Sequence, residues 1–308
     1  CGHSSIGGDG LLTRLPSGRW NGDPMGERTV GVTPPRVMTI AGTDSGGGAG
    51  VAADLRTLAA CGVHGCVAVT AVTVQNSLGV TGVHTLPPET VAAQIEAVAT
   101  DIGLDAVKTG MLATTPIIRA IAEACDRTGI GSDGRTPLVV DPVAASMHGD
   151  PLLADNALDA YRTLLFPRAT VITPNLDEVR LLTGIDVCDR AGQYEAAKVL
   201  YAFGPRHVLV KGGHLADDRD VCVDLHYDGH TFTELPGPRF TTGNTHGGGD
   251  TMASALASGL ARRLPVDRAV AQAKRFVVEA VRHSYDLGAG HGPVSPLWVV
   301  RPWWRDPD

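Results

Sequence analysis

The sequence lacks several features that would mark other classes of protein. It has no uninterrupted apolar stretch of about 18 residues, so no membrane-spanning helix is predicted. Its six cysteines include no close CxxC pair, which excludes a disulfide framework and a zinc site. Basic residues are also fewer than acidic ones, 26 against 33. The resulting formal net charge of −7 argues against nucleic-acid binding through phosphate neutralisation. We therefore expect a protein of the reducing cytoplasm without nucleic-acid or membrane partners.

What is present suits a large globular fold. The chain has 308 residues, of which 43% are hydrophobic and 19% charged, enough to build a sizeable core. The first 35 residues contain eight glycines and four prolines and no apolar period, so residues 1–35 are predicted to be a flexible leader. No linker or repeat follows, and residues 36–296 are therefore expected to form one domain.

Short apolar runs alternate with amphipathic stretches along this domain. Most of the runs are continuous and β-branched, as in strands buried on both faces of a parallel sheet. Two helical stripes lie between and after them, one through Val91 and Ile95 and one through Val270 and Val277. The alternation predicts an α/β fold with a mostly parallel sheet covered by helices on both faces. The expected strands are Val37–Ile40, Cys66–Val74, Ala106–Thr109, Leu138–Val140, Thr170–Thr173 and His207–Val210, followed by a hairpin of Val221–Tyr227 and His230–Leu235.

In such folds ligands bind at the carboxyl ends of the strands, and a glycine-rich turn follows the first one. The turn spans 42–50 and opens a helix, so it could cradle an anion or let a substrate approach the backbone. Gly48, Gly50 and Ala53 satisfy the dinucleotide pattern G-x-G-x-x-A, but the acid expected at the end of the next strand is missing. No Walker A loop is present either. This turn alone does not identify a ligand.

The second glycine-rich segment, 242–251, is more informative. Gly247, Gly248 and Gly249 precede an apolar helix, and their backbone N–H groups could converge at its positive end to hold a phosphoryl group. Asp250 lies in the first turn of that helix. Its carboxylate is either a helix cap or a general base for a hydroxyl nucleophile, and spacing alone leaves both open.

Eight ordered segments resemble one enzyme family, the hydroxymethylpyrimidine/phosphomethylpyrimidine kinases of thiamine biosynthesis, which belong to the ribokinase-like superfamily. The resemblance implies a ribokinase-like three-layer fold and two ATP-dependent phosphorylations, of 4-amino-5-hydroxymethyl-2-methylpyrimidine and of its monophosphate to the diphosphate. It covers residues 36–296 and leaves out the leader and a Trp-rich tail, 297–308. The segments are AGTDSGGGAG, AVTVQN, VKTGML, VVDPV, TPNLDE, VLVKGGH, NTHGGGDT and LGAGHGPV.

The resemblance assigns five residues to the pyrimidine. Asp54 and Gln75 would bind the polar edge of the aminopyrimidine, because a carboxylate accepts from an amine and an amide both donates and accepts. Gly42 would let the ring approach the first strand, while Met111 and Val143 would form apolar walls. From the residues alone, Asp54 could instead be a solvated helix residue, and Met111 and Val143 ordinary core.

The remaining matches concern ATP and Mg²⁺. Lys211 would hold the ATP phosphates, with Thr245 and Lys274 also on the nucleotide side, although Lys274 could be an exposed helix lysine. Magnesium prefers oxygen ligands and keeps several waters, so a sparse set of ligands suffices. Helix capping by Asn175 with Glu178 three residues on is a competing or additional account. The metal ligands implied by the resemblance are Asp141, Asn175 and Glu178.

One position departs from the family. The family commonly reads G-T-G-C in the second glycine loop, whereas this chain has Gly-Gly-Gly-Asp, with the Asp found in sugar kinases of the superfamily. Asp250 is therefore predicted to be the base, residues 247–249 the anion hole and Lys211 the charge clamp. A pyridoxal/pyridoxine kinase and a non-catalytic pyrimidine or nucleotide sensor stay open as alternatives. The resemblance also implies a homodimer.

Overall fold

The computed structural model describes residues 33–131, 135–144, 152–153, 157–213, 215 and 220–300. The chain divides into Cys1–Thr33 and Pro34–Asp308. The predicted leader therefore lies almost entirely outside the described residues, as does the end of the predicted tail, 301–308.

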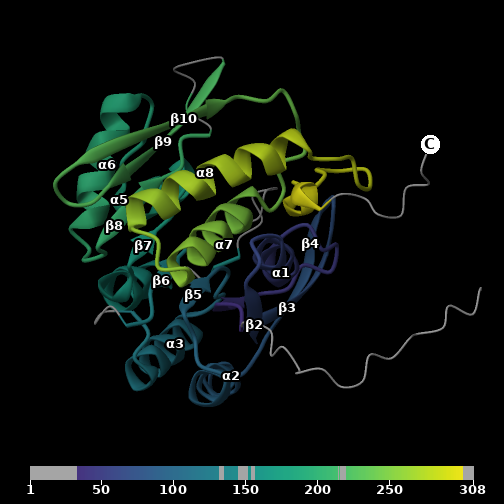
Figure 1. The fold of residues 1–308 in the computed structure, drawn as a ribbon, viewed down its shortest axis with the longest axis vertical. Coiled ribbons are helices and arrows are strands. Elements are labelled where there is room, and N and C mark those ends of the chain that lie inside the picture. The colour runs from purple at the N-terminus through teal and green to yellow at the C-terminus, as the bar shows by residue number, and fades with distance from the viewer. Residues whose placement is uncertain are drawn as a thin grey trace, which may run out of the picture. The chain divides into compact units, whose positions relative to one another are not determined.

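The core of the second unit is an eight-stranded sheet in the order β10-β9-β8-β7-β6-β5-β1-β2 (Figure 1). In this sheet β8, β7, β6, β5, β1 and β2 pair in parallel. β9 and β10 add an antiparallel hairpin at the β8 edge. The parallel strands other than the edge strand β2 are buried on both faces, as the continuous apolar runs predicted. The strands are β1 (Arg36–Ala41), β2 (His64–Val69), β5 (Ala106–Thr109), β6 (Leu138–Val140), β7 (Val171–Ile172), β8 (His207–Val210), β9 (Val221–Tyr227) and β10 (Phe232–Pro238).

Helices cover both faces of this sheet, which confirms the predicted layering. One face packs on α1, α7 and α8, and alternate strand residues such as Val37, Ala106 and Val139 point into that layer. The other face packs on α2 to α6 through the intervening residues. The helices are α1 (Gly50–Ala60), α2 (Pro88–Asp101), α3 (Thr115–Thr128), α4 (Ala157–Ala160), α5 (Leu176–Thr183), α6 (Arg190–Tyr201), α7 (Gly248–Ala261) and α8 (Val266–Arg282), with short irregular turns Tyr161–Leu165, Phe166–Arg168 and Pro296–Val299.

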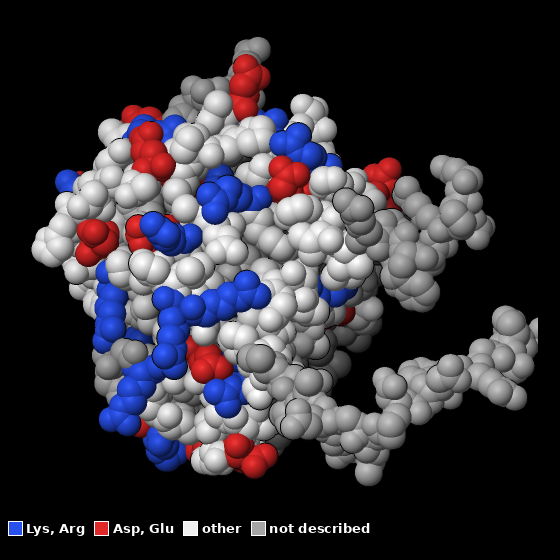
Figure 2. Space-filling view, viewed as in Figure 1, with Lys and Arg blue, Asp and Glu red and all other residues white. Residues whose placement is uncertain are grey.

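The outermost helix, α8, is amphipathic. It buries Ala269, Val270 and Ala273 against the layer below and exposes Arg268 and Arg275 on its other side. Figure 2 shows that face, on which Lys and Arg side chains gather. No helix in the described part of the chain is long and apolar enough to cross a membrane.

The expected strand Cys66–Val74 was wrong as a single element. The chain turns away from the main sheet at Thr70, so its second half forms β3 (Ala71–Asn76), which pairs with β4 (Gly79–Thr85) in a separate two-stranded sheet. Thr70 fixes the break, because its hydroxyl donates to the carbonyl of Met111 and its amide to that of Ala41. β4 itself was not predicted, since it lacks a continuous apolar run.

The late hairpin was predicted, but its second strand starts two residues later than expected. Asp228 Oδ1 accepts hydrogen bonds from the amides of His230 and Thr231, which extends the turn before β10 begins at Phe232.

Candidate active site

The chemistry-bearing residues gather where the parallel strands end. Gly42 follows β1, Asp141 follows β6 and Lys211 follows β8. Because these strands run in one direction, their carboxyl ends share one edge, and the two glycine loops lie there as well.

The two glycine loops pack directly against each other. Gly247 has a φ of +75°, and a Cβ on it would lie 2.0 Å from the carbonyl oxygen of Gly48. A Cβ on Gly48 would in turn meet the ring of His246. Both positions therefore require glycine for the backbones to approach, which explains one of the glycines in each segment.

Asp44 organises this contact and is a residue that the sequence analysis missed. Its carboxylate accepts hydrogen bonds from the amides of Gly46, Gly48 and Ala49 at 2.8–2.9 Å. One of its oxygens also lies 2.9 Å from Nε2 of His246. These bonds hold the pKa of Asp44 below its ordinary value despite its burial. Asp44 thus ties the first loop to the second.

Asp250 lies at the start of α7 but does not cap its own helix. Its Oδ2 accepts from the amide of Gly50, the first residue of α1, at 3.0 Å, and its Oδ1 accepts from Lys108 Nζ at 2.8 Å. Burial would raise the pKa of Asp250, but the Lys108 ammonium lowers it below the ordinary value. The carboxylate is therefore ionised, caps the N-terminus of the neighbouring helix, and has 14% of its side chain exposed at the site.

The start of α7 also offers backbone donors. The amide of Gly248 donates to the carbonyl of Thr245 and that of Thr251 to Gly247. Within the described residues, the amides of Gly249 and Asp250 have no acceptor in the protein. These two N–H groups at the positive end of a 14-residue helix are suited to hold an anion.

Lys211 lies beside these donors with two carboxylates. Its Nζ donates to Asp141 Oδ1 at 2.9 Å and lies 3.9 Å from Glu178 Oε2. A Cβ on Gly249 would be 3.3 Å from the same Nζ, so the ammonium faces the start of α7. Burial would lower the pKa of Lys211, but Asp141 and Glu178 raise it. Burial raises the pKa of Glu178 to about 7, which Lys211 only partly offsets.

Asn175 takes the capping role that was left open for it. Its side chain accepts from the amide of Glu178 at 2.8 Å, and Glu178 Oε2 accepts from the amide of Asn175 at 2.7 Å. This capping box begins α5 directly after β7. The side-chain oxygen of Asn175 is thus directed at the helix, whereas Asp141 Oδ2 approaches the start of α7.

The residues assigned to the pyrimidine, Asp54 excepted, follow β1, β5 and β6 or lie on β3. Met111 forms a small apolar cluster with Ala71 and Ala113, against which Val143 packs. A Cβ on Gly42 would lie 3.0 Å from the sulfur of Met111, so a larger residue there would require the Met111 side chain to move. Gln75 is half-buried on β3, at a bulge, and its Oε1 accepts from Thr73 at 3.3 Å.

The structure contradicts the assignment of Asp54 to the substrate. Asp54 is 0% exposed, and its two oxygens receive four hydrogen bonds. Two come from Lys108, and the others from Thr39 and Ser254 at 2.6 Å each. Four bonds use all the acceptor sites of a carboxylate, so none is left for an aminopyrimidine. The alternative, a solvated helix residue, is equally wrong.

Lys274 is not an exposed helix lysine. It is 7% exposed and donates to Asp224 Oδ2 at 2.9 Å. The other oxygen of Asp224 accepts from the amide of Gly212, the residue after Lys211, at 2.9 Å. Asp224 therefore links Lys274 to the backbone that follows Lys211 at the end of β8.

Lys108 was missed, although a signal was available. The chain has four lysines against twenty-two arginines, and one of them, Lys108, stands inside the apolar run of β5. A charged residue in a strand buried on both faces needs a partner, and that requirement could have marked it.

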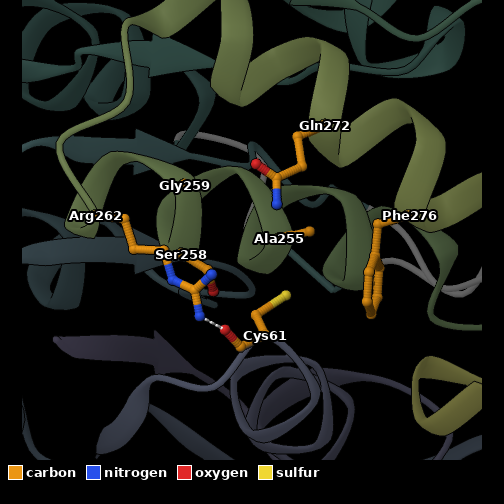
Figure 3. A pocket seen from close by; sticks show the side chains of 7 residues that line it. All are labelled: Cys61, Ala255, Ser258, Gly259, Arg262, Gln272 and Phe276. Carbon is orange, nitrogen blue, oxygen red and sulfur yellow. Dashed lines mark hydrogen bonds between the residues drawn. The ribbon is translucent and has the colours of Figure 1, made fainter. Parts of the chain in front are cut away.

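A small cavity lies away from these residues, between the end of α1 and the C-terminal half of α7 with α8 (Figure 3). Ser258 and Gln272 line it, and Arg262 donates across its edge to the carbonyl of Cys61. Its volume of about 10 Å³ is enough for at most one water. This cavity is therefore too small to hold a substrate.

The sequence comparisons agree on one family. The sequence profile described as phosphomethylpyrimidine kinase matches residues 44–295. A hydroxymethylpyrimidine/phosphomethylpyrimidine kinase of Mycobacterium tuberculosis is 58% identical over 268 residues, which are 87% of this chain and 96% of that protein.

Solved structures show the same fold. The phosphomethylpyrimidine kinase of Clostridium difficile superposes with a TM-score of 0.70 and 36% identity, over 80% of this chain and 99% of that one. The pyridoxal kinase of Staphylococcus aureus in complex with AMP-PCP and pyridoxal gives a TM-score of 0.76 at 34% identity, over 86% and 94%.

Proposed function

The chain belongs to the phosphomethylpyrimidine kinase family, and from this premise we propose that it phosphorylates 4-amino-5-hydroxymethyl-2-methylpyrimidine and then its monophosphate to the diphosphate, with ATP as donor, in thiamine biosynthesis. The Mycobacterium tuberculosis relative carries both kinase activities in its name, and this chain spans 96% of it. The binding of AMP-PCP by the Staphylococcus aureus pyridoxal kinase supports ATP as the donor.

The observation that carries the proposal is the position of Asp250 between the apolar residues that follow β1 and β5 and the backbone donors at the start of α7. On one side lie Gly42 and Met111, and on the other the unpaired amides of 249–250 and Lys211. A hydroxymethyl group bound at this junction would point its oxygen at the carboxylate. Asp250, kept ionised by Lys108, would take the hydroxyl proton as that oxygen attacks the γ-phosphorus of ATP, while the bond from that phosphorus to the β,γ-bridging oxygen breaks and ADP leaves.

Phosphoryl transfer spreads negative charge over the transferring group, so catalysis depends on positioned positive charge. The amides of Gly249 and Asp250 would bind its oxygens at the helix end. Lys211 would hold the transferring phosphoryl group, and Lys274 would support it by fixing the following turn through Asp224. We also place Thr245, which is exposed beside this loop, against the nucleotide.

Mg²⁺ fits the same edge, held through few protein ligands. In the described part of the chain no three His, Cys, Asp or Glu side chains are grouped as a metal cage. Asp141 and Glu178 nevertheless face the phosphate edge beside Lys211, and sparse carboxylates with waters and phosphates are the ligands that Mg²⁺ uses in kinases. When bound, the ion would neutralise phosphate charge. Asn175 would act by orienting Glu178.

On the pyrimidine side, Gln75 supplies an amide at the half-buried edge of β3, and Met111 and Val143 supply apolar walls. An amide can both accept from the exocyclic amine and donate to a ring nitrogen.

We also propose a homodimer formed through the sheet of β3 and β4. Val72, Val74 and Val83 of this sheet and Leu78 in its turn are 45–64% exposed, a concentration of apolar surface that a partner subunit would cover. A reducing cytoplasm suits the cysteines of the described part, which are free thiols.

The test is ATP consumption with the hydroxymethylpyrimidine, its monophosphate and pyridoxal offered separately, with the products identified by mass. We expect turnover on both pyrimidines. Turnover on pyridoxal alone would replace the proposal with the pyridoxal kinase alternative. Binding of a pyrimidine without turnover on any of the three would indicate the sensor.

A further inference from the structure

Lys108 is a buried cation directly behind the proposed base. It lies in β5, is 0% exposed, and points into the layer of α1 and α7. The three N–H groups of its ammonium match three acceptors, namely both oxygens of Asp54 at 2.9 Å and Oδ1 of Asp250 at 2.8 Å. A lysine has no further donor, so the side chain is fully committed to these two carboxylates.

Asp54 holds the ammonium in place from the far side. The hydroxyls of Thr39 on β1 and Ser254 on α7 each donate to it at 2.6 Å. Ser254 lies one helical turn after Asp250, so the same helix supplies the base and one support of its partner. The group contains two carboxylates and one ammonium, and only Asp250 reaches the site surface.

The fold does not by itself require this arrangement. Burying an ion pair has a desolvation cost that its attraction often fails to offset, and apolar replacements of whole buried pairs are often neutral or stabilising. An ion pair retained at the centre of the sheet therefore needs another reason. The contact with Asp250 supplies one, because each oxygen of that carboxylate is held by a different donor, Lys108 on one and the Gly50 amide on the other.

We propose that Lys108, anchored by Asp54, is a positioning residue that fixes the plane of the Asp250 carboxylate and holds it in its ionised form for proton removal. This inference rests on the proposed function, in which Asp250 is the base. With Oδ1 bound to the ammonium and Oδ2 bound to the amide, the carboxylate cannot rotate, and its free lone pairs have one orientation toward the site.

The electrostatics agree with this geometry. Burial raises the pKa of Asp54 to about 6, whereas the pKa of Asp250 is lowered, chiefly by Lys108. Two further titratable groups near Asp250 are His246 in the loop before α7, which also lowers the pKa of Asp250, and Lys211 after β8. Neither donates a hydrogen bond to the carboxylate in the described structure.

The decisive variant replaces both members of the Lys108–Asp54 ion pair. Lys108→Met alone leaves Asp54 buried without a cation and should unfold more easily. Lys108→Met with Asp54→Asn removes one charge of each sign and leaves the net charge of the chain unchanged. Lys198→Met, an exposed lysine on α6, controls for the substitution itself. The melting temperature, kcat, both KM values and the pH profile of kcat/KM are measured on each protein.

We expect the double variant to melt near the wild type, with kcat lowered on the order of 10–100-fold and both KM values nearly unchanged. The acid limb of its pH profile should move to higher pH, because the group that lowers the pKa of Asp250 is gone. Lys198→Met should match the wild type in every measurement.

A folded double variant with wild-type kcat and an unmoved acid limb would overturn the inference, as would a double variant that cannot fold. The failure of the proposed function is a separate outcome, in which the wild-type protein itself turns over neither pyrimidine.

Discussion

The backbone amide of Gly50 donates a 3.0 Å hydrogen bond to Oδ2 of Asp250, which stands 200 residues later in the sequence. Gly50 has a φ of +56°, and a Cβ there would lie 2.4 Å from the carbonyl oxygen of Gly42. One glycine thus joins the first turn, the start of α1 and the proposed base.

Gly50→Ala should therefore lower both stability and turnover. The added methyl group meets a backbone oxygen that already accepts a hydrogen bond from the Val51 amide, and the shift of α1 would disturb the bond to Asp250. We expect a lower melting temperature and at least a tenfold lower kcat, on the order expected for misplacing a catalytic group. Gly129→Ala is the matched control, because Gly129 has a φ of +70° but no atom within 4 Å of a Cβ. It should lower the melting temperature and leave kcat unchanged; equal kcat in the two variants would contradict the prediction.

Gln75→Ala tests the pyrimidine side. The side chain lies on the edge sheet, away from Lys211, so its loss should raise the KM for the pyrimidine and leave the KM for ATP unchanged. A loss of one hydrogen bond to a bound ligand corresponds to about 0.5–1.5 kcal/mol, or roughly a 2- to 13-fold change. Gln272→Ala, in the cavity of Figure 3, is the control. If the KM for ATP rose instead and the KM for the pyrimidine did not change, Gln75 would belong to the nucleotide side of the site and our assignment of the two sides would be reversed.

The sequence predicted well those features that depend on local pattern. The continuous apolar runs located β5, β6 and β8 at their observed bounds, and parallel strands necessarily bring their carboxyl ends to one edge. Asp141 and Lys211 could therefore be expected near each other, and their side chains lie 2.9 Å apart.

The sequence could not predict which side chains from distant elements pair with each other. Lys108 and Asp250 are separated by 142 residues, and the alternation of β5 indicates only that Lys108 faces one helical layer, not which carboxylate it meets. Asp54 looked accessible because it follows the glycine turn, but α1 rotates it inward, where β1, β5 and α7 each supply a donor. Such burial is decided by packing and not by spacing.

The buried His226, which contacts the half-buried His207, makes stability depend on pH. Nδ1 of His207 lies 3.1 Å from Nε2 of His226, and burial together with His207 lowers the pKa of His226 to about 4. An unfolded histidine titrates near 6.5, so between these values the unfolded chain binds the additional proton. The stability from the neutral ring is complete above about pH 6.5 and is lost as the pH falls toward 4.

Urea unfolding between pH 7 and pH 4.5 should show this slope, at most about 1.4 kcal/mol per pH unit for one proton. His226→Leu should flatten it, while Thr233→Val, at the cross-strand position, should keep it. An unchanged slope in His226→Leu would assign the acid sensitivity to other groups.

Asp250→Asn tests the proposed base. Asparagine keeps the size of the side chain and can still accept from Gly50, so α1 keeps its cap and the protein should fold. It cannot take a proton, and general-base catalysis contributes about 10²–10⁴-fold, so kcat should fall within that range while both KM values change little. Asp250→Cys introduces the residue common in the family and should retain more activity than Asp250→Asn, with a rate that rises toward the thiol pKa.

Asp250→Ala separates the two roles of this carboxylate. Without either oxygen, α1 loses its cap, and we expect a loss of about 0.5–2 kcal/mol in the free energy of unfolding in addition to the loss of turnover. Asp105→Asn is the control, because Asp105 loses an ion pair with Arg36 at the opposite end of β5 and should keep wild-type kcat. Melting temperature and turnover measured on all four variants distinguish a cap from a base. If Asp250→Asn turned over at the wild-type rate, the carboxylate would serve only as the cap of α1, and the hydroxyl proton would have to leave by another route.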